Sequence, residues 1–509
     1  MTKVMPQIET VVMLMLENRS LDTVLGWLHN APTDQDGHKP KVTFLPPGSD
    51  PRFNGIRAGM TNAKRHGDVS RTYPPAHGTQ GFEQSLRTPR ADPWEGMAHV
   101  QYQMYADENG PPTTLGWGPN APMTGFAWDY PALWDRSGEV MGAYTAEQLP
   151  VLYGLAENFA VSDAWFSPVP TETDPNRAFA ICGTSLGATG DFPMRNYDAP
   201  TIFNGLDDAG VEWGIYWQYN GWLDMDPVYR HRQCWTVDRF PQIGRSLDAG
   251  HGRVAPYAEF FRQLADDSLP KFCYIEPYWG WGIGSPDGTD FVGLQGNDYH
   301  CPTWVGTAEA DLNQLYEALQ NSNQWEHMLF IISFDEHGGT WDHVSPPATL
   351  APDQHRGTYS SHQPPFDFTR LGPRVPTLLV SPYVVPGTVF RPPAAASLAF
   401  DHTSFIATIL AWAGTSSAFL KTMGRRVANA PLFDHAMSDV PFLNNRPEFS
   451  IPIDPVGQPP NKGPHGFPFD VSYLPWDELR AIGVDPKTGD RLSFNEVIER
   501  VRLLEKPTG

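Results

Sequence analysis

Short apolar segments recur along the chain, and each is followed by a polar turn and then by a stretch with helical spacing. The first covers residues 10–16, and apolar side chains then recur every three or four positions over 21–28. Comparable apolar segments occupy 271–275, 328–332 and 377–380. Short buried strands that alternate with amphipathic helices predict an α/β fold with a largely parallel sheet.

Polar side chains that can bind a cation follow two of these predicted strands. Glu17 and Asn18 come after the first, and Asp335 and Glu336 lie just beyond the strand at 328–332. Ligand-binding groups collect beyond the carboxyl ends of strands in open α/β sheets, and such oxygen ligands suit Ca²⁺, Mg²⁺ or Mn²⁺, while carboxylates also accept Zn²⁺. The same spacing also fits simple helix caps, with Asn18 or Ser20 at one helix and the acidic pair at another.

The periodic pattern weakens in two regions. Residues from about 32 to 129 are rich in Pro, Gly, His and Trp, which predicts a long loop-rich insertion over one face of the sheet that helps to form the substrate pocket. Residues 436–509 form a Pro-rich C-terminal extension, and a capping box at 493–496 predicts that it ends in a helix. The catalytic domain is therefore expected to span 1–435.

Composition narrows the class of protein. The 509 residues include 46 Gly and 51 Pro, which excludes a helical bundle, a coiled coil or a solenoid. The net charge of −22 repels polyanions, so we expect no nucleic-acid partner. The four cysteines lie far apart without a C-x-x-C pair, which supports neither a zinc cage nor a disulfide framework.

No apolar run approaches the ~20 residues that cross a bilayer, so we expect no transmembrane segment. Residues 1–9 contain one Lys but no apolar core of a signal peptide. The expected form is therefore cytoplasmic, exported by a route without a signal peptide, or a matured secreted protein.

A third segment, residues 167–177, contains two candidate nucleophiles. Pro175 marks the expected start of a helix, and the positive end of a helix dipole together with a nearby metal ion favours an alkoxide. Thr171 and Thr173 both lie close to that start, and either hydroxyl also fits a helix cap.

Residues 17–22 have the sequence E-N-R-S-L-D, and residues 173–177 have the sequence T-D-P-N-R. These segments resemble the E-N-R-S-F-D opening and the T-x-P-N-R motif of the bacterial and plant phosphoesterase family that contains non-specific phospholipases C and an acid phosphatase. Further blocks of similarity are 149–153, 160–166, 183–185, 297–300, 335–344, 374–376, 381–382 and 401–404.

This resemblance implies an alkaline-phosphatase-like α/β sheet between helices and a single divalent metal ion. It also implies that Thr173, rather than Thr171, is the nucleophile. The ion would be held by residues that match Glu17, Asn18, Thr173, Asp335 and Glu336.

The sequence departs from the family pattern at two places. The family's G-P-T is replaced by Thr171-Glu172-Thr173, and Cys301 stands before the proline of the histidine block. Because Glu172 adds negative charge beside Thr173, we expect a dianionic phosphate monoester to bind less readily than a singly charged diester.

Three histidines match family positions that face the phosphate, namely His300, His343 and His77. A protonated imidazole can donate a hydrogen bond to a phosphate oxygen or a proton to the departing alkoxide. His337 and His402 are expected to be structural.

The sequence thus predicts a metal-dependent phosphoesterase, phospholipase C-like, that acts through a phosphothreonine. Its substrate would be a phospholipid or small phosphate ester, preferably with a zwitterionic or neutral head group, reached by transient contact with a membrane surface. One alternative is an acid phosphatase for soluble monoesters, which would share these residues. Another is an inert binding descendant, against which the five intact ligand residues argue.

Overall fold

A computed structural model describes the protein over most of its length. The described residues are 3–29, 41–57, 59–63, 69–71, 86–107, 109–110, 116–130, 137–191, 196–218, 234–284, 291–294, 296–357 and 365–451.

The centre of the fold is a nine-stranded sheet in the order β2-β13-β5-β12-β11-β1-β8-β6-β7. Its strands are β1 (Thr10–Leu16), β2 (Thr43–Leu45), β5 (Ala160–Ser162), β6 (Trp213–Trp217), β7 (Arg253–Pro256), β8 (Phe272–Glu276), β11 (Met328–Phe334), β12 (Thr377–Val380) and β13 (Thr388–Phe390). The central strand β1 runs parallel to both neighbours, β8 and β11. The predicted α/β class is confirmed.

One predicted strand runs in the unexpected direction. The strand β12 has the predicted bounds, but it pairs antiparallel with both β11 and β5. Its end therefore lies at the opposite edge of the sheet, where the Ser381 hydroxyl donates a hydrogen bond to the carbonyl oxygen of Met328, the first residue of β11. The residues after β12 thus lie away from the residues after β1 and β11.

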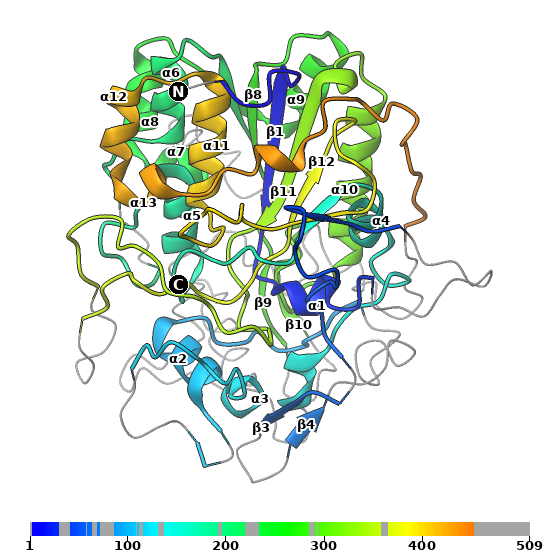
Figure 1. Ribbon diagram of the computed structural model, residues 1–509, viewed down its shortest axis with the longest axis vertical. Coiled ribbons are helices and arrows are strands. Elements are labelled where there is room, and N and C mark those ends of the chain that lie inside the picture. Colours follow the sequence, from blue (N-terminus) through cyan, green and yellow to red (C-terminus); the bar gives the residue numbers. More distant parts are fainter. Residues whose placement is uncertain are drawn as a thin grey trace, which may run out of the picture.

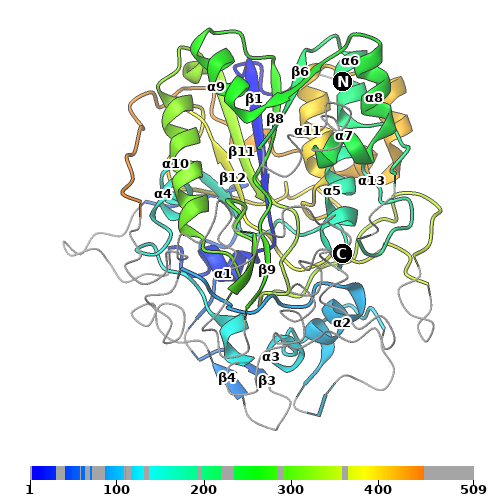
Figure 2. The same ribbon diagram turned by 180° about the vertical axis from the view of Figure 1, so that it is seen from behind.

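Helices cover both faces of the sheet (Figures 1 and 2). One layer contains α5 (Thr173–Cys182), α6 (Ile202–Asp208), α7 (Trp235–Arg239), α8 (Pro241–Asp248), α11 (Thr403–Ala413), α12 (Ser417–Leu420) and α13 (Gly424–Asn429). The other contains α4 (Pro150–Asn158), α9 (Tyr257–Ala265) and α10 (Gly306–Gln320). The short helix α1 (Leu21–Leu25) follows β1, and the Ser20 side chain caps it by accepting from the Thr23 backbone N–H.

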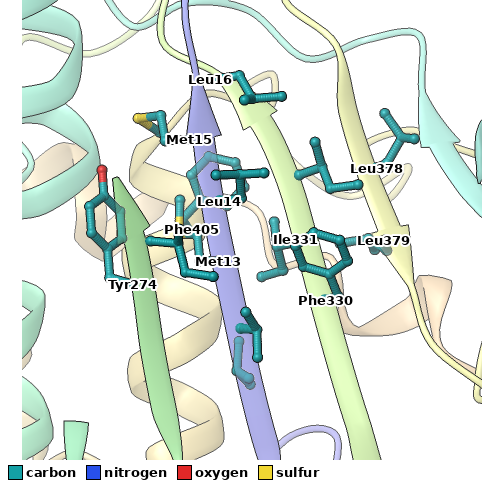
Figure 3. Packing of buried hydrophobic residues seen from close by; sticks show 14 of the residues in the cluster. Met13, Leu14, Met15, Leu16, Tyr274, Phe330, Ile331, Leu378, Leu379 and Phe405 are labelled. Carbon is teal, nitrogen blue, oxygen red and sulfur yellow. The ribbon is translucent and has the colours of Figure 1, made fainter. Parts of the chain in front are cut away.

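The main core lies between these layers (Figure 3). All seven residues of both β1 and β11 are buried, as expected for central strands that are covered on both faces. The ring of Phe405 on α11 stacks on Trp165, with centroids 4.3 Å apart. All four cysteines are buried free thiols.

The insertion has a small core of its own. It includes α2 (Met97–Tyr105), α3 (Phe126–Asp129), β3 (Thr61–Ala63) and β4 (Val69–Arg71), and the pictures place these elements together beyond the end of the sheet where α1 lies (Figures 1 and 2). Val100, Met104 and Phe126 form a hydrophobic cluster with Trp341, which belongs to the loop after β11. The insertion is thereby packed against the carboxyl end of the central strands.

Smaller elements complete the described chain. They are the hairpin β9 (Trp281–Gly284) and β10 (Phe291–Leu294) and the 3₁₀ turns Ser137–Met141, Trp325–His327, Lys421–Met423 and Asp434–Ala436. In the C-terminal extension, Phe449 packs near Tyr316 of α10, with ring centroids 5.6 Å apart. The predicted terminal helix falls on 452–509, outside the described residues. Within the described part, no helix has the length and apolar character needed to span a bilayer.

Candidate active site

The pairing of β1 with β11 brings the two predicted acidic ends together. The register sets Leu16 beside Phe334, so the following residues emerge side by side. The Asn18 N–H donates to Asp335 Oδ1 at 3.1 Å, and the Arg19 N–H donates to the carbonyl oxygen of Glu336 at 3.1 Å. Residues more than 300 positions apart thus form one loop pair.

This loop pair needs a glycine at position 338. Gly338 has φ +62°, and a Cβ atom there would lie 2.1 Å from the Asn18 carbonyl oxygen. Asn18 itself has φ +51°, a left-handed conformation that asparagine tolerates better than most residues. The close approach explains why the loop after β11 continues with glycine.

Thr173 lies at the first position of α5, and its side chain faces the end of β1. Its Oγ1 is 3.4 Å from Glu17 Oε2 and 3.3 Å from Asn18 Oδ1. The Thr171 hydroxyl instead donates to the carbonyl oxygen of Thr189 at 2.7 Å. The structure therefore brings Thr173, and not Thr171, to the predicted ligand residues.

A buried arginine joins these carboxylates, and we call Arg177, Glu17, Asp335 and Glu336 the Arg177 cluster. Arg177, one turn after Thr173 on α5, has Nη2 2.7 Å from Glu17 Oε1 and Nε 3.2 Å from Asp335 Oδ2. Its guanidinium carbon lies 4.2 Å from the centre of the Trp279 ring. These contacts make Arg177 an ion-pair partner of the acidic residues.

The Arg177 cluster has more buried negative than positive charge. Burial and the nearby Asp335 raise the pKa of Glu17 well above its usual value, although Arg177 acts in the opposite direction. Burial, Glu95 and Asp335 likewise raise the pKa of Glu336. Glu336 Oε2 accepts from the Gly338 N–H, but the fully buried Oε1 has no hydrogen-bond partner among the described residues. Such an oxygen, beside other carboxylates, fits a divalent cation.

His300 also lies in this region, and the insertion supplies two acidic residues that face it. Its Nδ1 is 3.5 Å from Glu17 Oε2, while its Nε2 is 3.5 Å from both Asp92 Oδ1 and Glu95 Oε1. Burial lowers the pKa of His300, but the carboxylates of Asp92 and Glu95 outweigh it and raise that pKa well above its usual value. The imidazolium form is therefore favoured.

His343 lies in a second ion-pair group, the Arg374 cluster of Arg374, Asp22, Asp342 and His343. Its Nδ1 is 2.6 Å from Asp22 Oδ2, and Arg374 pairs with Asp22 and Asp342 at 3.0 Å each. Its Nε2 lies 3.2 Å from Asn54 Oδ1, and its side chain is 16% exposed. Among the described residues, no hydrogen bond or ion pair links His343 to Thr173.

Two further histidines, His402 and His337, are fully buried and differ in this from His343. His402 accepts from the Trp165 indole N–H at 3.2 Å and lies 2.7 Å from the carbonyl oxygen of Asp335, and burial lowers its pKa to about 3. His337 is also fully buried and contacts Gln103 Oε1 at 2.9 Å. Both have structural contacts, as predicted. His77 lies outside the described residues.

Comparison with known proteins identifies the family. The family model described as "Phosphoesterase family" matches residues 8–414. The chain belongs to the Phosphoesterase family. Among the relatives of this phosphoesterase, non-specific phospholipase C4 of Arabidopsis thaliana is 32% identical over 415 residues, which cover 79% of this chain and 67% of that protein. Phospholipase C A of Mycobacterium tuberculosis strain H37Rv is 27% identical over 442 residues, with 79% and 72% covered.

Solved structures resemble this phosphoesterase more distantly. A protein of the alkaline phosphatase superfamily from Vibrio parahaemolyticus has a TM-score of 0.32 and 13% identity, and the match covers 56% of this chain and 64% of that one. The family relationship places the protein among hydrolases that act on phosphoric ester bonds.

The acidic residues around His300 in this phosphoesterase could not be recognised from the sequence pattern. Asp92 and Glu95 lie in the weakly periodic insertion, where no predicted strand or helix marks them as site residues. Asp298 was also missed: it is buried, and its Oδ1 accepts from the His300 backbone N–H at 3.2 Å. Its place two residues before His300 in a family-like block was the one available signal.

Proposed function

We propose that this phosphoesterase is a phospholipase C-like enzyme that cleaves phospholipid phosphodiesters through a phosphothreonine at Thr173. The observation that supports it most directly is the Thr173 hydroxyl at the start of α5, within 3.4 Å of both Glu17 Oε2 and Asn18 Oδ1. The names of the plant and mycobacterial relatives support the phospholipid substrate.

A single divalent metal ion fits the oxygen-rich ligand set predicted from the sequence. Glu17, Asn18, Asp335 and Glu336 would hold it beside Thr173, and the unpartnered Glu336 Oε1 supports this assignment. Oxygen donors of this kind suit Mg²⁺, Mn²⁺ or Ca²⁺, and carboxylates also accept Zn²⁺. When bound, such an ion lowers the pKa of a coordinated hydroxyl and neutralises phosphate charge.

The residues of the chain have distinct roles in this proposal. Thr173 Oγ1 loses its proton to bulk water and attacks the phosphorus in line with the leaving alcohol, so that a P–Oγ1 bond forms while the bond from phosphorus to the alcohol oxygen breaks. The positive end of the α5 dipole favours the attacking alkoxide. His300, held as the imidazolium, donates a hydrogen bond to a non-bridging phosphate oxygen. Water then cleaves the phosphothreonine and regenerates the hydroxyl.

The departing alkoxide needs a proton, which we assign to His343. The hydrogen bond between His343 Nδ1 and Asp22 Oδ2 orients the ring, so that Nε2 lies 3.2 Å from Asn54 Oδ1 on a side chain that is 16% exposed. A carboxylate that orients a histidine in this way is typical of acid–base catalysis. His77 stays a second prediction for the same role.

The charge around the site favours a diester with a zwitterionic or neutral head group. Glu172, Asp92 and Glu95 add negative charge near Thr173 and His300, and a monoester dianion is repelled more strongly than a monoanionic diester. The net charge of −22 acts in the same direction on polyanionic substrates.

The decisive experiment measures the products from a substrate panel. Phosphatidylcholine and an anionic phospholipid in mixed micelles, together with phosphocholine and a soluble aryl phosphate, are each incubated with the enzyme, and phosphate is assayed with and without a second phosphatase. We expect phosphocholine and diacylglycerol from phosphatidylcholine, and phosphate only after the second step. Direct phosphate release from the monoesters alone would instead indicate an acid phosphatase, and no turnover of any substrate would indicate an inert descendant.

A further inference from the structure

The side-chain amide of Asn18 lies between the proposed nucleophile and a carboxylate of the insertion. Its Oδ1 is 3.3 Å from Thr173 Oγ1, and its Nδ2 donates to Glu95 Oε1 at 2.9 Å. His300 Nε2 lies 3.0 Å from the same Nδ2. Asn18 is fully buried, so water does not compensate for a wrong orientation of the amide.

The chemistry of these neighbours fixes which end of the amide faces Thr173. A rotated amide would set Oδ1 2.9 Å from Glu95 Oε1, where two acceptor oxygens repel each other, and would turn the NH₂ group toward Thr173. An ionised carboxylate only accepts hydrogen bonds, so Glu95 accepts from Nδ2. In the imidazolium form of His300, the Nε2–H has the Asp92 and Glu95 carboxylates as acceptors, each 3.5 Å away, and not the Asn18 amide nitrogen. Glu95 is therefore the neighbour that orients the Asn18 oxygen.

Glu95 is itself held in place by the loop that leads into α2. The carbonyl oxygen of the preceding residue, Trp94, accepts from Gln103 Nε2, and Gln103 Oε1 contacts His337 Nε2. His337 is adjacent in sequence to Glu336. The Glu95 side chain is only 14% exposed. The insertion is thus tied to both loops of the loop pair.

We propose that Glu95 is a positioning residue: by accepting from Asn18 Nδ2, it presents Asn18 Oδ1 to Thr173 and to the cation expected beside it. This inference rests on the proposed function for the roles of Thr173 and the cation. It assigns the insertion a part in the phosphoryl-transfer centre, in addition to covering the end of the sheet.

Two variants of equal side-chain length test it. Glu95→Gln keeps an oxygen that accepts from Asn18, whereas Glu95→Met fills the same space without one. Each purified protein is stripped of metal and titrated with Mn²⁺ by calorimetry, and kcat/KM is then measured with the metal restored. We expect Glu95→Met to weaken Mn²⁺ binding and to lower kcat/KM by about 10- to 100-fold, as for other residues that orient metal ligands. Glu95→Gln should bind Mn²⁺ with close to wild-type affinity, whereas its kcat/KM also reflects the loss of a carboxylate 3.5 Å from His300.

Three controls distinguish the positioning role of Glu95 from effects of its charge and from effects on folding. Asp92→Asn removes a carboxylate at the same 3.5 Å distance from His300, but Asp92 has no bond to Asn18 among the described contacts, so Mn²⁺ affinity should fall less than in Glu95→Met. Asp107→Ala removes an exposed carboxylate of the insertion and controls for general effects on this region. In an Asn18→Ala background, Glu95→Met should add almost no further loss, because the oriented amide is absent.

The outcomes separate two claims, the positioning role of Glu95 and the proposed function of the enzyme. Three results would each overturn the positioning role. They are wild-type Mn²⁺ affinity in folded Glu95→Met, equal losses of Mn²⁺ affinity in Glu95→Gln and Glu95→Met, and additive losses of Mn²⁺ affinity in the double variant. If Glu95→Met does not fold, Glu95→Gln decides the question. A folded Glu95→Gln protein with clearly weakened Mn²⁺ binding overturns the positioning role, and one with near-normal Mn²⁺ binding supports it. The expected Mn²⁺ pattern in a protein that hydrolyses no phosphoester would overturn the proposed function alone.

Discussion

Two buried arginines organise the carboxyl ends of the central strands, and they differ in how completely their charge is matched. In the Arg374 cluster, every guanidinium nitrogen has an acceptor: Nε and Nη2 bind Asp342 and Asp22, and Nη1 donates to the carbonyl oxygens of Asn54 and Asp163. Burial opposes it, but His343 and Arg374 keep the pKa of Asp22 below its usual value. Both carboxylates of the group are thus paired with the guanidinium.

The Arg177 cluster starts from the same pattern of one arginine and two carboxylates and adds a third, Glu336. Arg177 Nη1 and Glu336 Oε1 are both buried without a hydrogen-bond partner in the described part of the chain. An unmatched buried carboxylate is costly, and the nearest further positive charge is His300, 3.5 Å from Glu17. The difference fits the proposal that the Arg374 cluster serves structure while the Arg177 cluster takes a divalent cation.

The largest expected effect is on turnover and concerns Thr173, beside the Arg177 cluster. Thr173→Ala should lower kcat by about 10⁴-fold or more, because removal of a covalent nucleophile eliminates the main reaction path. Thr171→Ala should keep most of the turnover and lose about 1 kcal/mol of stability with its bond to Thr189. Steady-state kinetics and denaturant unfolding of both variants measure this. Comparable turnover in Thr173→Ala and wild type would show that the nucleophile has been misassigned.

Disruption of the Arg374 cluster should lower the free energy of unfolding. Arg374→Met leaves Asp22 and Asp342 buried without their cation, and the loss of one partner of a buried ion pair costs about 3–5 kcal/mol. Urea unfolding at pH 7 measures it, with exposed Arg52→Met as the control because Arg52 pairs only at the surface. A loss below that of the control would contradict the structural role of this cluster.

Metal removal should affect only the Arg177 cluster. A divalent ion at 100 times its Kd should stabilise the wild type by about 2.7 kcal/mol, whereas Glu336→Gln should gain much less from the same ion. Without metal this variant should be the more stable of the two proteins, because the substituted amide carries no buried charge. Thermal unfolding with and without chelator, together with elemental analysis, tests this. A fully active wild-type preparation without metal would contradict the assignment.

His343 sharpens the comparison of the two arginine clusters, because it belongs to the Arg374 cluster but has a proposed catalytic role. His343→Ala should lower kcat/KM by about 10²-fold, the lower range for a lost general acid. Its metal content should stay at the wild-type level, unlike that of Glu336→Gln. Kinetics and elemental analysis of the same preparation decide the matter, and unchanged kcat/KM would remove His343 from the mechanism.

The smallest effect is a pH dependence of stability from His402, behind the Arg177 cluster. Burial lowers its folded-state pKa to about 3, whereas the unfolded value is about 6.5. Between these values the unfolded chain binds more protons, so stability is present above pH 6.5 and is lost as the pH falls, by about 1.4 kcal/mol per pH unit. His402→Gln should flatten this slope over pH 5.0–6.5 in urea unfolding. An unchanged slope would show that other groups cause it.

The sequence predicted the elements that local pattern controls. The bounds of β1 and β12 agree with the apolar runs, and Thr173 begins α5 two residues before Pro175. The direction of β12 was not predictable from its own residues, because an apolar run has the same pattern in parallel and antiparallel neighbours. Its reversal follows from its pairing with β5 and β11.

The site was predicted only in part for a related reason. Acidic residues after strands are visible in the sequence, and the structure brings Glu17, Asn18, Asp335 and Glu336 together with Thr173. The contact between Glu95 and Asn18 spans 77 residues and leaves no periodic trace in the insertion. The bond from Arg374 to Asp22 spans 352 residues and joins two segments that separately fit many roles.

The long separation between the two halves of the loop pair also has a consequence for synthesis. Asn18 leaves the ribosome 317 residues before Asp335, so a nascent chain carries two of the five predicted oxygen ligands long before Asp335 and Glu336 exist. The strand β1 can acquire its neighbour β11 only after residue 334 has emerged. Chains stopped before that point cannot assemble the proposed cation site, so the proposal makes metal loading a late step in the maturation of this enzyme.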